Sequence, residues 1–166
     1  MVLTKSELIA ALQDEVRVLL HLASKIVPAR LDYRPTPKQR STLELVKYLT
    51  MMGPTLVKCA KAGAFDEAEW AAAEQVAQAQ TFEQALATIA SHANTYPALL
   101  ADVSDADLRA EVDVFGEKAS RGVFLVKWVL SGCAAYRMQL FLYLKASGRE
   151  ELGTMNLWSG VDAGEA

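Results

Sequence analysis

The sequence has few of the residues from which metal sites and disulfide frameworks are built. Its 166 residues include two cysteines and two histidines, and no Cys-x-x-Cys pair. Two isolated cysteines predict reduced thiols, and two distant histidines do not form a conventional zinc site by themselves. Because the sequence also lacks a Glu-x-x-His pair, it excludes the di-iron site found in some helical bundles. The residues alone therefore predict no metal and no other cofactor.

Sequence motifs of several enzyme classes are also absent. There is no P-loop, no Gly-x-Gly-x-x-Gly, no His-Glu-x-x-His and no Gly-x-Ser-x-Gly. Cys133 is a candidate nucleophile only if its pKa is lowered, and an inert, buried thiol is the preferred interpretation. We therefore assign no catalytic residue from the sequence.

Charge is neither abundant nor concentrated. The chain carries 17 basic and 20 acidic residues, with a net charge of -3, and no basic run that would predict nucleic-acid binding. The most apolar stretch is interrupted by Lys127 and Arg137, which argues against a membrane span. The N-terminus lacks the apolar segment of a secretion signal, so we expect a cytoplasmic protein.

What the sequence does contain is a helical pattern. Apolar residues make up 52% of the chain and charged residues 22%, which is typical of a globular protein with one domain, here residues 1–166. Capping boxes at Thr4, Ser41 and Thr81 predict three helix starts. Long amphipathic helices are expected over residues 4–27, 41–62, 81–100 and 120–148, the second broken at Gly53-Pro54. These four helices predict an all-α, up-down four-helix bundle with a long connection.

Shorter features lie between and after these helices. We expect a short helix over 66–78, a helical turn from Ser104, and an extended piece over 111–115. Residues 149–166 are predicted to form an irregular tail, with Leu157 and Trp158 against the bundle and the last few residues loose.

The last long helix has two distinct faces. One carries Lys127, Ser131, Ala134, Met138 and Lys145. The opposite face must border the core or a site, since Gly132 leaves room there and Gln139 needs a partner if buried. That face consists of Leu125, Trp128, Gly132, Tyr136, Gln139 and Tyr143.

Neither histidine is predicted to be a ligand. His21 shares a helix face with Arg17 and Lys25, which indicates a solvated cationic surface. His92 lies with polar neighbours, Thr88 and Thr95, which indicates a surface or boundary position.

Several stretches of the chain together carry a family resemblance: Arg34-Pro35 followed by residues 41–49, then 136–140, 143–148 and 155–160. They resemble the DinB/YfiT-like family, and the order of elements is similar over nearly the whole chain. The resemblance implies a four-helix bundle and a homodimer.

The same resemblance implies where a metal would bind. Many members hold a divalent metal on three histidines, and those positions fall here on Tyr48, Gly132 and Tyr136. A neutral phenol, with a reference pKa of about 10, is a poor zinc or nickel ligand. We therefore expect a degenerate, metal-free site in a protein with a structural or small-ligand-binding role. The alternative is a metal- or thiol-dependent transferase or hydrolase with altered residues.

The candidate pocket comprises Tyr48, Gly132, Tyr136 and the neighbouring Gln139. The two phenols either fill the old cavity with aromatic volume or act, with Gln139, as polar groups in a pocket that Gly132 keeps open. The sequence leaves these two interpretations equally open.

Overall fold

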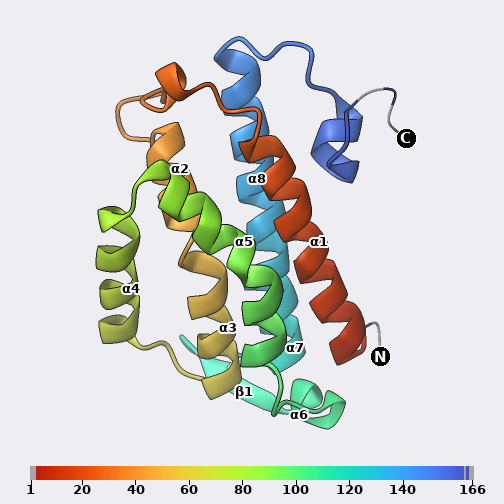
Figure 1. Cartoon of the computed structure of the whole chain (residues 1–166). Helices are drawn as coiled ribbons and strands as arrows, with labels where there is room; N and C mark the ends of the chain where they lie inside the picture. The colour runs from red at the N-terminus through yellow and green to blue at the C-terminus, as the bar shows by residue number, and fades with distance from the viewer. Residues whose placement is uncertain (1–2, 163, 165–166) are drawn as a thin grey trace.

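Long helices packed side by side form most of this computed structural model, which describes residues 3–162 and 164 (Figure 1). Helix α1 spans Lys5–Ala23, α2 Thr42–Leu49, α3 Met52–Ala62 and α5 Phe82–Leu99. The last long helix consists of α7 (Arg121–Phe124), a π turn (Leu125–Leu130) and α8 (Ser131–Ala146), which follow one another without a gap. Helix α1 packs against α5 and α8, and α2 and α3 pack against α5 and the last helix. The predicted all-α bundle is confirmed.

The helix starts are those that the capping residues predict. Thr4, Ser41 and Thr81 each accept a hydrogen bond from the backbone three residues on, and the side chain there reaches back to the cap. These reciprocal bonds satisfy backbone N–H groups that a helix start otherwise leaves unpaired. A fourth capping box, at Ser104, begins the short helix α6 (Asp105–Arg109).

Two predicted helix boundaries are wrong. The first helix ends at Ala23, ahead of a 3₁₀ turn at Pro28–Arg30. The break in the second helix lies at Thr50 and Met51, so Gly53 and Pro54 sit in the first turn of α3. Proline is tolerated there because the first N–H groups of a helix have no intrahelical partner. At the break, the Thr50 hydroxyl donates a hydrogen bond to the Lys47 carbonyl.

Helix α4, Glu67–Ala79, stands outside the bundle beside α2 and α3 (Figure 1). It was predicted from Asp66, whose side chain accepts a hydrogen bond from the Glu69 N–H. Most of its surface is exposed, and Ala77 is its buried residue. Its position matters for the site because it brings Trp70 against Tyr48.

A two-stranded hairpin precedes the last helix. Strand β1 (Glu111–Val114) was predicted as an extended piece, whereas its partner β2 (Glu117–Ser120) was not. The strands pair antiparallel with Val114 opposite Glu117, leaving Phe115 and Gly116 as a two-residue turn. Their φ angles of 57° and 78° match the turn type that two-residue hairpins favour.

Polar groups are buried where α1, α5 and α8 meet. Arg137 of α8 forms an ion pair with Glu15 of α1, with Nε and Oε2 3.0 Å apart, and also donates to the Leu157 carbonyl. Burial raises the pKa of Glu15, while Arg137 opposes that shift. His92 is buried too, with Nε2 3.0 Å from the Thr50 carbonyl, so its predicted surface position is wrong. The break between α2 and α3 leaves the Thr50 carbonyl accessible to the His92 side chain.

The C-terminal segment returns to α1. It contains a π turn (Met155–Ser159) in which Leu157 is buried, as predicted, whereas Trp158 is 65% exposed, contrary to the prediction. His21 does not lie on a solvated face, because Asn156 Nδ2 and Asp162 Oδ1 approach its Nε2 at 3.2 and 3.6 Å. The predicted loose end falls largely on residues 163 and 165–166, outside the described residues.

Candidate functional site

An open groove of about 670 Å³ lies between α2 and α3 on one side and the last helix on the other. Its walls hold two of the three tryptophans, two of the five tyrosines and two of the five phenylalanines. Three of the four predicted site residues line it: Tyr48, Gly132 and Tyr136. The full lining is Tyr48, Met52, Leu56, Phe65, Trp70, Val114, Phe115, Glu117, Lys127, Trp128, Ser131, Gly132, Ala135 and Tyr136.

The six aromatic rings of the groove form a continuous series. From Tyr136 the series runs to Tyr48 at 5.1 Å between ring centroids, and from Tyr48 to Trp70 at 6.3 Å. Phe65 then lies 5.5 Å from Trp70 and 5.2 Å from Phe115, and Phe115 lies 6.2 Å from Trp128. The rings meet in tilted or edge-on geometries, which the quadrupole of an aromatic ring favours. They come from five segments: α2, the loop before α4, α4, the hairpin and the last helix.

Tyr48, between Tyr136 and Trp70 in this series, is held neutral. Burial, and then a hydrogen bond with Tyr136, raise the pKa of Tyr48 above its usual range. The Arg40 guanidinium lies over the Tyr48 ring, 3.9 Å from its centroid, a cation–π contact that fixes the ring. At neutral pH this phenol is therefore a hydrogen-bond donor and not a phenolate.

Gly132 lies beside the thioether of Met52. A Cβ at Gly132 would meet the Met52 Sδ and Cε atoms at 3.5 Å, an ordinary contact distance. Glycine at position 132 therefore leaves space in the groove. It is not needed there to prevent a steric clash.

Gln139 is not among the residues that line the groove. Its Nε2 donates to the Tyr143 hydroxyl at 2.6 Å, and that hydroxyl donates to the Arg40 carbonyl at 3.0 Å. Gln139 thus has the partner that its half-buried position requires. The chain of bonds connects α8 to the residue that precedes the Ser41 cap.

Lys127 and Ser131 were predicted on the outer face of the last helix, yet both line the groove. The π turn explains the difference: i→i+5 bonding fits more residues into a turn and shifts the face that follows. Lys127 Nζ donates to both carboxylate oxygens of Glu117 at 2.7 Å. The charges in the groove lining therefore form an ion pair. Sequence periodicity at 3.6 residues per turn could not locate them.

The side chains at the three positions from the resemblance do not suit a metal ion. Glycine offers no donor, and a protonated phenol is a poor ligand for zinc or nickel. Among residues 3–162 and 164, no three His, Cys, Asp or Glu side chains come together as a possible metal site. Cys133 does not act as a ready nucleophile, because burial raises the pKa of its thiol to about 12.

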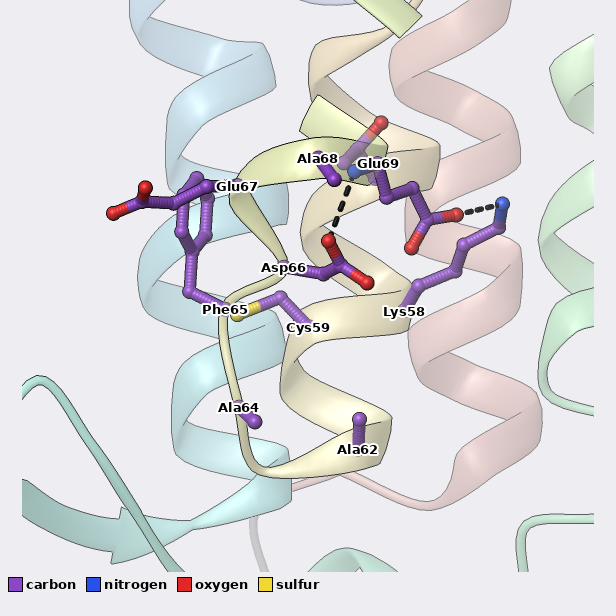
Figure 2. Close-up of a pocket in the computed structure, with 10 residues that line it drawn as sticks. Lys58, Cys59, Ala62, Ala64, Phe65, Asp66, Glu67, Ala68 and Glu69 are labelled. Atoms are coloured by element: carbon purple, nitrogen blue, oxygen red, sulfur yellow. Dashed lines mark hydrogen bonds and ion pairs between the residues drawn. The ribbon is translucent and has the colours of Figure 1, made fainter. Parts of the chain in front are cut away.

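A second hollow, of about 570 Å³, lies between α3 and the start of α4 and shares Phe65 with the groove (Figure 2). Three of its four charged side chains, Lys58, Asp66 and Glu69, are engaged within it. The Asp66 carboxylate accepts from the Glu69 N–H at 2.9 Å, and Lys58 pairs with the Glu69 side chain. Burial raises the pKa of the Cys59 thiol. The aromatic groove is therefore the better candidate for a ligand site.

Comparison with known structures identifies the architecture. A DinB-like protein of Bacillus subtilis, YjoA, superimposes with a TM-score of 0.67 over 89% of this chain and 95% of that chain. The fold is DinB-like. The two sequences are 22% identical, so this likeness concerns the fold alone. No family model matches the sequence, and the comparison with curated proteins found no similar one. Among the described residues, no helix is long and apolar enough to cross a membrane.

Proposed function

We propose that this DinB-like protein binds a small, uncharged and largely apolar molecule in the aromatic groove, without a metal. One observation carries the proposal: six aromatic side chains from five segments meet at a groove and leave it open. An arrangement that only filled a former cavity would bury these rings against one another. Concave, mainly apolar sites with a few polar groups are typical of small-molecule binding.

The polar groups of the groove indicate what the ligand carries. Tyr48 and Tyr136 share one hydrogen bond, and in such a pair the phenol that accepts keeps its own O–H, which can donate to an acceptor atom of the ligand. The Lys127–Glu117 pair provides two opposite charges that compensate each other. An uncharged ligand with an oxygen acceptor, such as a ketone, fits this combination better than an ion does.

The test is a fluorescence titration with Prodan, a flat naphthyl ketone whose emission shifts to the blue in an apolar site. The wild-type protein should give a saturable shift, and Gly132→Leu, which fills the groove beside Met52, should abolish it. Ala90→Leu adds the same side chain at an exposed position of α5 and should bind like the wild type. A wild type without a saturable shift, or a Gly132→Leu variant that binds equally well, would refute the proposal.

The proposal that no metal is bound has its own test, which is elemental mass spectrometry of the untagged protein. We expect no stoichiometric zinc, nickel, manganese or iron. Near one metal per chain would contradict this proposal and favour the enzyme alternative.

We also propose that the protein is a homodimer. The last helix exposes four apolar side chains, Val123, Val126, Met138 and Leu142, and the last of them is 56% exposed. Exposed apolar side chains of this kind support helix-to-helix association between copies. Light scattering should give twice the 18.1 kDa chain mass, and Leu142→Glu should give the monomer. A monomeric wild type at micromolar concentration would contradict the dimer.

A further inference from the structure

We propose that Phe115, at the tip of the hairpin, is a specificity-determining residue that stacks on a flat aromatic ring of the ligand. The inference rests on the proposed ligand-binding function and goes further, because it selects one class of ligand: planar aromatic molecules over saturated ones of similar size.

Phe115 has an unusual backbone conformation. Its φ of 57° makes it the single non-glycine residue with a positive φ among residues 3–162 and 164. In this conformation the Cβ of an L-residue crowds the backbone, and bulky side chains are especially rare. The first position of such a two-residue turn strongly favours asparagine, aspartate or glycine. Phenylalanine is therefore unfavourable for the turn itself.

The Phe115 side chain lies at the surface and is not part of the core. Phe115 is 76% exposed, although Phe65 and Trp128 touch it from the groove side. The hairpin does not need this ring for anchorage, because Val114, which is 2% exposed, provides the buried contact. An exposed ring on a strained turn contributes little to the fold. What the residue does provide is an aromatic surface at the edge of the groove.

The exposed ring surface of Phe115 would select one kind of ligand. Rings stack with their centroids about 4.5–7 Å apart, and Phe115 already makes such contacts with Phe65 on one side and Trp128 on the other. The largest part of its surface remains available. A flat aromatic ligand can continue the series of rings, whereas a saturated ring gains only apolar burial. Locally unfavourable backbone conformations are retained mainly at functional sites.

The experiment compares three variants of Phe115 with two probes. Prodan is the flat probe, and cyclododecanone, a saturated ring ketone measured by its displacement of Prodan, is the second. Phe115→Asn and Phe115→Leu should each weaken Prodan binding about fivefold to tenfold, whereas Phe115→Tyr keeps the ring and the affinity. Cyclododecanone affinity should change less than twofold. Trp158→Ala, which removes an exposed ring outside the groove, should change neither.

Thermal unfolding checks that each variant is folded. Because asparagine tolerates the left-handed conformation, Phe115→Asn should raise the midpoint by about 2–4 °C while it loses affinity. Wild-type affinity in Phe115→Asn, or equal losses for the flat and the saturated probe, would overturn the inference and leave the proposed function intact. A wild type that binds neither probe would overturn both. A lower midpoint for Phe115→Asn would refute the strained turn.

Discussion

Gly53 and Gly132 both lie in helices that border the bundle interior, but their surroundings differ. A Cβ at Gly53 would lie 2.1 Å from the hydroxyl oxygen of Tyr96, which is 1% exposed. A Cβ at Gly132 would meet the Met52 thioether at 3.5 Å. The first glycine allows a large side chain to pack against the backbone. The second leaves part of the groove empty.

The contrast extends to the two sides of the last helix. Towards α1 and α5, Arg137 pairs with Glu15, and the Tyr96 hydroxyl interacts with the Cys133 thiol. Towards α3 and α4, the rings of Trp128 and Tyr136 stay partly exposed. The buried side stabilises the fold, so substitutions there should change stability strongly. The groove side should tolerate change and affect binding instead.

The largest effect should come from Arg137→Ala. It would leave the Glu15 carboxylate buried without its partner, and breaking a buried pair in this way costs about 3–5 kcal/mol of unfolding free energy. Urea denaturation measures the loss. Arg34→Ala, which removes an exposed pair with Glu44, should cost less than about 1 kcal/mol. Equal losses for the two variants would show that the buried ion pair contributes no more to stability than the exposed one.

The next largest effect is a dependence of the unfolding free energy on pH. Burial lowers the pKa of His92 to about 4, below the value of about 6.5 for an unfolded chain. The unfolded state therefore binds the proton first, and stability falls as the pH drops from 6.5 to 4, by about 3 kcal/mol in total. His92→Gln should remove this component from the pH profile measured by urea denaturation. An unchanged profile would contradict the buried, neutral imidazole.

Gly53→Ala should cost about 2–3 kcal/mol, because its Cβ collides with the Tyr96 hydroxyl and the ring is too well packed to move. Removing that hydroxyl tests the cause. In the double variant with Tyr96→Phe, the nearest ring atom lies 3.2 Å from the new Cβ, so most of the loss should be recovered. Strictly additive losses would point to a different cause.

The smallest effect is expected at Gly132. Gly132→Ala removes the entropic disadvantage of glycine within a helix and creates no clash, so it should stabilise the protein by about 0.5–1 kcal/mol. Denaturation measures this gain. A loss of stability would show that Gly132 is as tightly packed as Gly53, and the contrast between the two would disappear.

The sequence predicted most of the helical framework, because local chemistry determines it. Capping boxes lie at Thr4, Ser41 and Thr81, and their bonds form within a few residues. The break at Thr50 was missed because Gly53 and Pro54 are the stronger local signals. His92, whose side chain lies against the Thr50 carbonyl at this break, belongs to another helix. No local sequence pattern reveals such a contact.

The lining of the groove could be predicted only in part. Tyr48, Gly132 and Tyr136 came from a resemblance, and the structure places all three in the groove lining. Phe65, Trp70 and Phe115 were missed because their role depends on where a loop, an outer helix and a hairpin pack. Phe115 did leave one local signal: an aromatic residue directly before Gly116, at a position where a two-residue turn favours asparagine.

The way the groove is assembled has a consequence for finding its ligand. Since its walls come from α2, α3, α4, the hairpin and the last helix, the groove exists only while these segments are held together. A molecule that binds there acts as a reversible crosslink and shifts the whole unfolding equilibrium, by about 2.7 kcal/mol at a concentration 100 times its Kd. The melting temperature of the protein therefore reports occupancy of the groove for any compound, whether or not it fluoresces or reacts.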